Sequence, residues 1–150
     1  MRYIKTFESF DFEGTFINIG NSYNNQKNKD VHKTFRLARI EGKLKKVPVS
    51  NLEVKYLKRI HEKLGIFFKH SLDKWFCCCY YYNNPENTKE SPYATINIEK
   101  YENNWYFVTV VNATLFLEEK YICNEIEGLM DLYKYLISNN YLKYTIQEFA

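Results

Sequence analysis

The chain has 150 residues and a formal net charge of +3 at pH 7, and 45% of its residues are hydrophobic, including 14 Tyr and 11 Phe. This composition excludes an intrinsically disordered chain, because such chains lack the apolar side chains that a core needs. The longest uncharged apolar run, residues 75–82, is too short for a membrane-spanning helix, which needs about 20 residues. We expect a single domain over residues 1–150, with no membrane partner.

Charge is distributed unevenly along the chain. Residues 1–85 carry a net charge of +8, and residues 86–150 carry a net charge of −5. A basic first half is compatible with an anionic partner, although solvated surface charge is the commoner reason for such a pattern.

The first twelve residues, MRYIKTFESFDF, interleave aromatic and charged side chains. In a helical turn Tyr3, Phe7 and Phe10 lie on one side, so residues 1–12 are a candidate docking segment. The alternative is a terminal turn whose aromatic rings fill the edge of the core.

The first ten residues, M-R-Y-I-K-T-F-E-S-F, also carry a resemblance. They resemble the opening Met-(Lys/Arg)-x-Ile-Lys-x-Phe-Glu-x-Phe of many small uncharacterised proteins encoded by tailed bacteriophages. The resemblance implies a phage origin, a location in the host cytoplasm or the virion, and a phage or host protein as partner. Some openings of this kind target proteins into the assembling head.

Residues 16–19 predict a short strand, and two polar segments, 20–30 and 83–92, predict loops. Residues 32–49 favour two strands around a turn at Glu41-Gly42, because apolar side chains alternate there with basic ones. A helix that begins at Asp30 is the alternative.

Two segments have the apolar spacing and the end signals of amphipathic helices. Residues 51–64 follow a capping box made by Ser50 and Glu53, and a glycine comes directly after them. Residues 125–137 have the same kind of start signal, with Asn124 as the expected N-cap and Glu127 three residues later, and Asn139-Asn140 follows them.

Between these helices the sequence predicts strands at residues 75–82, 93–101, 104–112 and 114–122. The first has no polar face, which is typical of an interior strand with a helix on one side. Short turns favour antiparallel pairing. The predicted fold class is α+β: an antiparallel sheet of about four to six strands, with the two helices, about 51–64 and 125–137, mainly on one face.

No motif predicts chemistry. Cys77, Cys78 and Cys79 are consecutive, and neighbours on a strand point to opposite faces, so we expect small buried side chains rather than a zinc site or disulfides. His61 is expected at the boundary of a helix stripe. Five glycines include no phosphate-binding loop. We therefore expect no catalytic, cofactor or metal site, and no enzyme.

The leading hypothesis is a small non-enzymatic, phage-encoded protein that acts by protein–protein contact, as a virion accessory component or an inhibitor of a host system. Its basis is the phage-like opening, the lack of a catalytic constellation and the many tyrosines, a residue type enriched at interfaces.

The alternative is a single-stranded nucleic-acid-binding module built on the basic segment 27–46. Its candidate phosphate contacts are Lys33, Arg36, Arg39, Lys43, Lys45 and Lys46. Bases would stack on exposed aromatic rings, for which the candidates are Tyr80, Tyr82, Tyr101 and Trp105. The simpler explanation is that these rings belong to the core and that the lysines are solvated.

Overall fold

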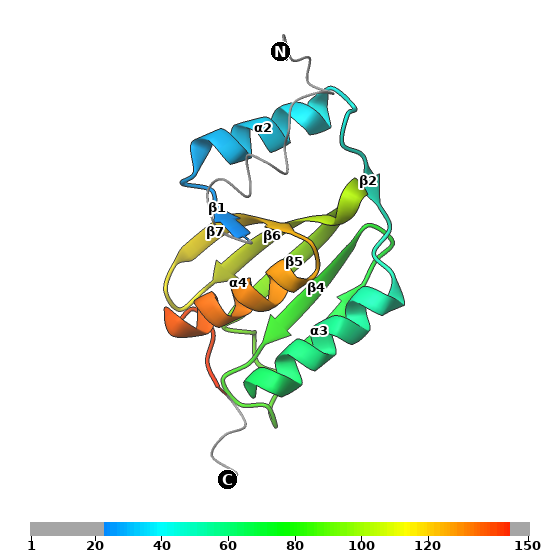
Figure 1. The fold of residues 1–150 in the computed structure, drawn as a ribbon. Helices are drawn as coiled ribbons and strands as arrows, with labels where there is room; N and C mark the ends of the chain where they lie inside the picture. Colours follow the sequence, from blue (N-terminus) through cyan, green and yellow to red (C-terminus); the bar gives the residue numbers. More distant parts are fainter. Residues whose placement is uncertain (1–22, 145–150) are drawn as a thin grey trace.

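The computed structural model describes residues 23–144, which form one antiparallel sheet with helices on both of its faces (Figure 1). The helices are α2 (Lys29–Ile40), α3 (Asn51–Leu64) and α4 (Glu127–Ser138). The strands are β1 (Tyr23–Asn25), β2 (Lys46–Val47), β3 (Lys69–Leu72), β4 (Phe76–Tyr81), β5 (Ala94–Tyr101), β6 (Trp105–Asn112) and β7 (Leu117–Asn124). The predicted α+β class is confirmed.

The sheet has seven strands, more than the four to six expected, in the order β1-β7-β6-β5-β4-β3, with β2 paired to β5 beyond the end of β4. All pairs are antiparallel. The additional strands are short, and β3 has the sequence KHSL with every residue exposed. Such a strand has no apolar pattern and forms through its backbone pairing with β4.

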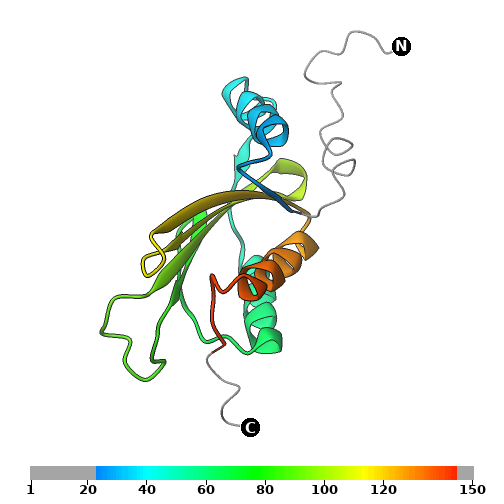
Figure 2. The same ribbon diagram turned by 90° about the vertical axis from the view of Figure 1, so that its left-hand side faces the viewer.

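Alternation along the strands gives the sheet two apolar faces. Ile96 and Ile98 point with the buried side chains of β6 toward α3 and α4, which form the main core. Trp105 and Ile122 point the other way and form a smaller core with α2. The expectation of helices mainly on one face therefore holds for α3 and α4, and α2 covers one end of the opposite face (Figure 2).

α2 replaces the first of the two strands predicted between residues 32 and 49, so the helical alternative is correct there, and the second predicted strand contains the short β2. Val31, Phe35 and Ala38 have helical spacing and are all buried. The side chain of Asn28 accepts a hydrogen bond from the backbone N–H of Val31 and caps the helix. The alternation of apolar and basic residues fits either structure locally, and the aromatic face of the sheet decides between them.

α3 is confirmed with the predicted bounds. The Ser50–Glu53 capping box is present at its start. Gly65 ends it in the left-handed conformation, with φ of 72°, and the following residue, Ile66, is buried.

α4 begins at Glu127, two residues later than predicted, and Asn124 does not cap it. Its N-cap position is Ile126, without a side-chain hydrogen bond. Asn124 ends β7, and the chain then turns through Glu125 at φ of 63°. The side-chain oxygen of Asn124 is buried and has no hydrogen-bond partner within the described residues.

Two further predictions differ from the structure. Segment 20–30 is not a loop throughout, because it contains β1 and the start of α2. Leu115 and Phe116 lie in a turn, and β7 begins only at Leu117. Segment 83–92 has neither helix nor strand and joins β4 to β5. Within residues 23–144 no helix has the length and apolar character that crossing a membrane requires.

Candidate functional site

The predicted docking residues Tyr3, Phe7 and Phe10 lie outside the described residues. The six predicted phosphate contacts are all exposed, and they belong to α2, to the segment after it and to β2: Lys33, Arg36 and Arg39, then Lys43 and Lys45, then Lys46. The structure therefore gathers the basic segment at one end of the sheet, around the helix that covers the smaller core.

The side chains of Arg39 and Lys46 are held by contacts within the protein. The guanidinium carbon of Arg39 lies 5.5–6.0 Å from the centres of three rings, those of Phe35, Tyr101 and Phe107. Its Nη1 also donates to the hydroxyl of Tyr101 at 3.3 Å. The Nζ of Lys46 lies 3.4 Å from a carboxylate oxygen of Glu99. The charges of Arg39 and Lys46 therefore interact with groups of the protein itself.

The outer face of α2, the side turned away from the sheet, carries both basic and apolar side chains. It consists of Lys29, Lys33, Arg36, Leu37 and Ile40, which are spaced three or four residues apart and are all exposed. Ile40 is 72% exposed. The outer face of α2 is thus a basic helix face that ends in an exposed isoleucine.

Three of the four aromatic rings considered for base stacking are buried: those of Tyr82, Tyr101 and Trp105. Tyr80 is half-buried, and its hydroxyl lies 3.0 Å from the hydroxyl of Ser71. For these three rings the stacking alternative is therefore wrong and the simpler explanation, that they belong to the core, is correct. Tyr101 and Trp105 form the floor on which α2 packs.

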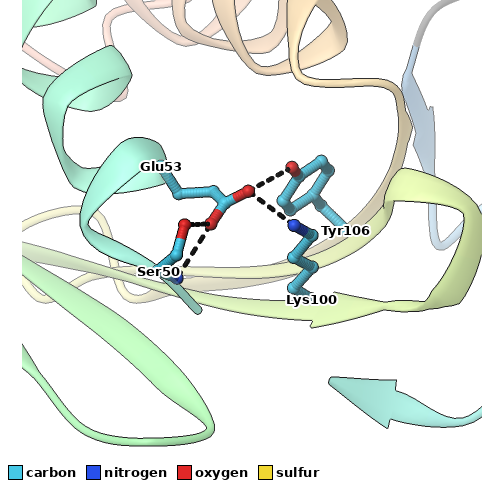
Figure 3. Close-up of polar contacts among 4 residues, drawn as sticks. All are labelled: Ser50, Glu53, Lys100 and Tyr106. Atoms are coloured by element: carbon cyan, nitrogen blue, oxygen red, sulfur yellow. Dashed lines mark hydrogen bonds and ion pairs between the residues drawn. The ribbon is translucent and has the colours of Figure 1, made fainter. Parts of the chain in front are cut away.

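A buried carboxylate joins the start of α3 to the sheet (Figure 3). One oxygen of Glu53 accepts hydrogen bonds from the backbone N–H and the hydroxyl of Ser50. The other lies 2.6 Å from the Nζ of Lys100 and accepts a hydrogen bond from Tyr106 at 3.3 Å. Burial opposes ionisation of Glu53, but the hydrogen bonds from Lys100 and Ser50 outweigh it and lower the pKa of the carboxyl.

His61 is buried rather than at a boundary, because its ring is enclosed by α3, β4 and α4. Its Nδ1 lies 2.6 Å from the carbonyl oxygen of Leu57, and its Nε2 lies 2.7 Å from the hydroxyl of Tyr81. That hydroxyl lies 2.9 Å from the hydroxyl of Tyr133. The ring of Phe68 stacks on the imidazole at 3.8 Å. Burial lowers the pKa of His61 to about 4, so the imidazole is neutral at pH 7.

The cysteines are free thiols, and three of them face the main core: Cys77, Cys79 and Cys123. The hydrogen bond with Cys77 and burial raise the pKa of Cys79, and burial raises the pKa of Cys123, so neither thiol ionises at pH 7. Among residues 23–144, no three His, Cys, Asp or Glu side chains come together in a way that could hold a metal ion.

A second buried carboxylate was not anticipated from the sequence. Glu119 is buried on the side of β7 that faces α4. Its Oε1 accepts hydrogen bonds from Tyr121 at 2.5 Å and from Asn25 at 2.9 Å. Only the pairing of β1 with β7 brings Asn25 to this position, and neither segment signals it locally.

The clusters around Glu53, His61 and Glu119 have the residue types of catalytic sites, but each is enclosed and bonded within the fold. Their arrangement stabilises the packing of helices on the sheet. The accessible functional candidate is thus a surface, the outer face of α2. No protein family model matches the chain, and neither do curated proteins or solved structures.

Proposed function

We propose that the protein binds another protein through the outer face of α2, as a phage-encoded virion accessory component or an inhibitor of a host system. The single observation that carries this proposal is the position of Ile40, which is 72% exposed at the C-terminal end of a helix face that also carries Lys33 and Arg36. The phage-like opening of residues 1–10 supports the origin and the setting.

The combination of side chains favours a protein over a nucleic acid. Burying Leu37 and Ile40 is favourable against apolar side chains of a partner, and phosphate groups offer no such surface. Lys33 and Arg36 flank them and pair best with acidic side chains. The partner is therefore a protein with an apolar patch bordered by Asp or Glu.

Affinity capture tests the proposal. The tagged protein is captured from a lysate of the cells in which it is naturally produced. We expect a stoichiometric protein partner that persists after nuclease treatment and is lost from the Ile40→Ser variant. The matched control is Leu52→Ser, because Leu52 is 70% exposed on α3 and lies on a different surface. Failure of the wild-type protein to retain any partner, or equal loss from both variants, would refute the proposal.

The second candidate function, single-stranded nucleic-acid binding, is favoured by the charge of the same region. Residues 27–46 contain eight basic and two acidic residues. Binding of oligothymidine would then fall steeply as salt rises and would be abolished by Lys33→Glu with Arg36→Glu. Ile40→Ser would leave it unchanged. The matched charge control is Lys58→Glu with Arg59→Glu on the exposed side of α3.

A further inference from the structure

The turn between β6 and β7 exposes the least buried aromatic ring of the described chain. Asn112 and Leu117 pair across the hairpin, and residues 113–116 form the turn between them. Phe116 is 95% exposed, and its neighbour Leu115 is about half exposed. α2 packs against the opposite end of these strands, at Trp105 and Ile122, so the turn is separate from the outer face of α2 (Figure 2).

Hydrogen bonds hold this turn in one conformation. The buried Asn112 accepts a hydrogen bond from the backbone N–H of Leu115 at 2.9 Å and donates to the carbonyl oxygen of Tyr141 at 2.8 Å. The backbone N–H of Ala113 donates to the carbonyl oxygen of Tyr93 at 2.8 Å. The ring of Phe116 is therefore presented on a turn that loses little conformational freedom when it binds.

The backbone conformation of Phe116 is unfavourable for its residue type. Its φ is 52°, a left-handed conformation that suits Gly or Asn and that a bulky side chain adopts only at a cost. The exposed ring makes almost no compensating contact within the fold. An aromatic residue kept in a strained and exposed position is typical of a functional contact.

The charges around the turn distinguish a protein from a membrane as its partner. Residues 101–119 contain no Lys or Arg, and the exposed charge next to the turn is that of Glu118. The first basic residue, Lys120, lies 3.2 Å from the carboxylate of Glu118. A loop that inserts into an anionic membrane surface is expected to carry basic residues, and the turn and the strand before it carry none, while Lys120 is paired with Glu118.

We propose that residues 113–116 are a second protein-docking element, which inserts Phe116 and Leu115 into an apolar pocket on a partner protein. An aromatic side chain held on a rigid turn matches the anchors that dominate binding energy at protein interfaces. Because this site lies at the other end of the sheet, it operates independently of the outer face of α2.

The test replaces Phe116 with the photo-crosslinking residue benzoylphenylalanine in the tagged full-length protein and irradiates it in lysate. We expect one discrete adduct, which excess unlabelled wild-type protein removes and excess Phe116→Ser protein does not. With the crosslinked protein purified, Phe116→Ser should weaken its Kd at least about tenfold, and Ile40→Ser should leave the Kd unchanged.

Several results would overturn this inference. They are the absence of an adduct, equal competition by the Phe116→Ser protein, an adduct with a second copy of the chain, or Phe116-dependent sedimentation with phosphatidylserine-containing vesicles. If affinity capture finds no Ile40-dependent partner and the Phe116 adduct still forms, the proposed function is rejected and this inference stands. The Phe116→Ser variant must unfold at no lower temperature than the wild type, because its side chain is 95% exposed.

Discussion

The Nε2 atom of His61 lies 2.7 Å from the hydroxyl oxygen of Tyr81, and both side chains are buried. The direction of this hydrogen bond follows from the other ring nitrogen. Nδ1 faces the carbonyl oxygen of Leu57, which only accepts, so Nδ1 carries the proton. Nε2 therefore accepts from Tyr81, and the hydroxyl of Tyr81 accepts from Tyr133. This direction is that of the neutral imidazole, which burial favours.

Acid should destabilise the protein through His61. Its pKa is about 4 in the folded state and 6.5 ordinarily, so the unfolded chain binds a proton that the folded protein excludes. The free energy of unfolding should be highest above pH 6.5 and should fall between pH 6.5 and about 4. The loss should be about 3 kcal/mol, measured by urea denaturation across this range. Below about pH 4 the contribution of His61 should change no further.

The His61→Leu variant isolates this contribution. His32 also has a lowered pKa, because burial outweighs its hydrogen bond to Asn24, and it adds to the slope in the same direction. We compare the slopes of the free energy of unfolding against pH for the wild type and for His61→Leu. Subtracting one slope from the other removes the contribution of His32, which both proteins share. Equal slopes for the two proteins between pH 4 and 6.5 would mean that His61 is protonated in the fold.

Removing the hydroxyl of Tyr81 should cost more stability than removing that of Tyr133. Tyr81→Phe leaves the Nε2 of His61 without a donor and the hydroxyl of Tyr133 without this acceptor. Tyr133→Phe leaves the bond from Tyr81 to His61 intact. We expect a loss of about 2 kcal/mol for Tyr81→Phe and about 1 kcal/mol for Tyr133→Phe. Chemical denaturation measures both, and the reverse order would contradict the assigned direction of the chain.

Glu53→Ala should lower the free energy of unfolding by about 2–4 kcal/mol, because it removes a helix cap and leaves Lys100 without its partner in a site that is mostly enclosed. The control is Glu62→Ala on the exposed side of the same helix, which should change stability by less than about 0.5 kcal/mol. Lys100→Met in the Glu53→Ala background should recover part of the loss. An additive double variant would show that the two charges do not interact.

The sequence predicted those elements whose signals are local. The capping box at Ser50 and the glycine after α3 determine that helix without help from the rest of the fold. Most of α2 was predicted as a strand because Phe35 satisfies both a helical and an alternating pattern. The choice depends on Trp105 and Ile122, which are distant in sequence and meet α2 only in the folded protein.

The surfaces could be predicted only in part for the same reason. The basic character of Lys33 and Arg36 is visible in the sequence, and the position of Ile40 among them required the correct assignment of α2 as a helix. Phe116 is apolar and lies next to Leu117, so it was expected in a strand. Its exposure results from the register of β6 with β7, which places residues 113–116 in the turn.

Phe116→Asn should stabilise the protein while weakening the contact proposed for the turn. Asn adopts the left-handed conformation at φ of 52° more readily than Phe, and losing a ring that is 95% exposed removes little packing. We expect a gain of about 1 kcal/mol, which for a chain of this size raises Tm by about 2–4 °C. Differential scanning calorimetry measures this gain, and crosslinking competition by the same variant measures the contact.

Thr114→Asn provides the control, because it changes an exposed residue of the same turn whose φ is not positive. It should alter Tm by much less than Phe116→Asn. A lower Tm for Phe116→Asn would mean that the ring packs in solution, and the strain argument would then fail. A higher Tm with undiminished competition would separate the two effects: the turn would be strained, and the ring would have no role in docking. A higher Tm with lost competition would identify Phe116 as a residue that lowers stability and supports binding.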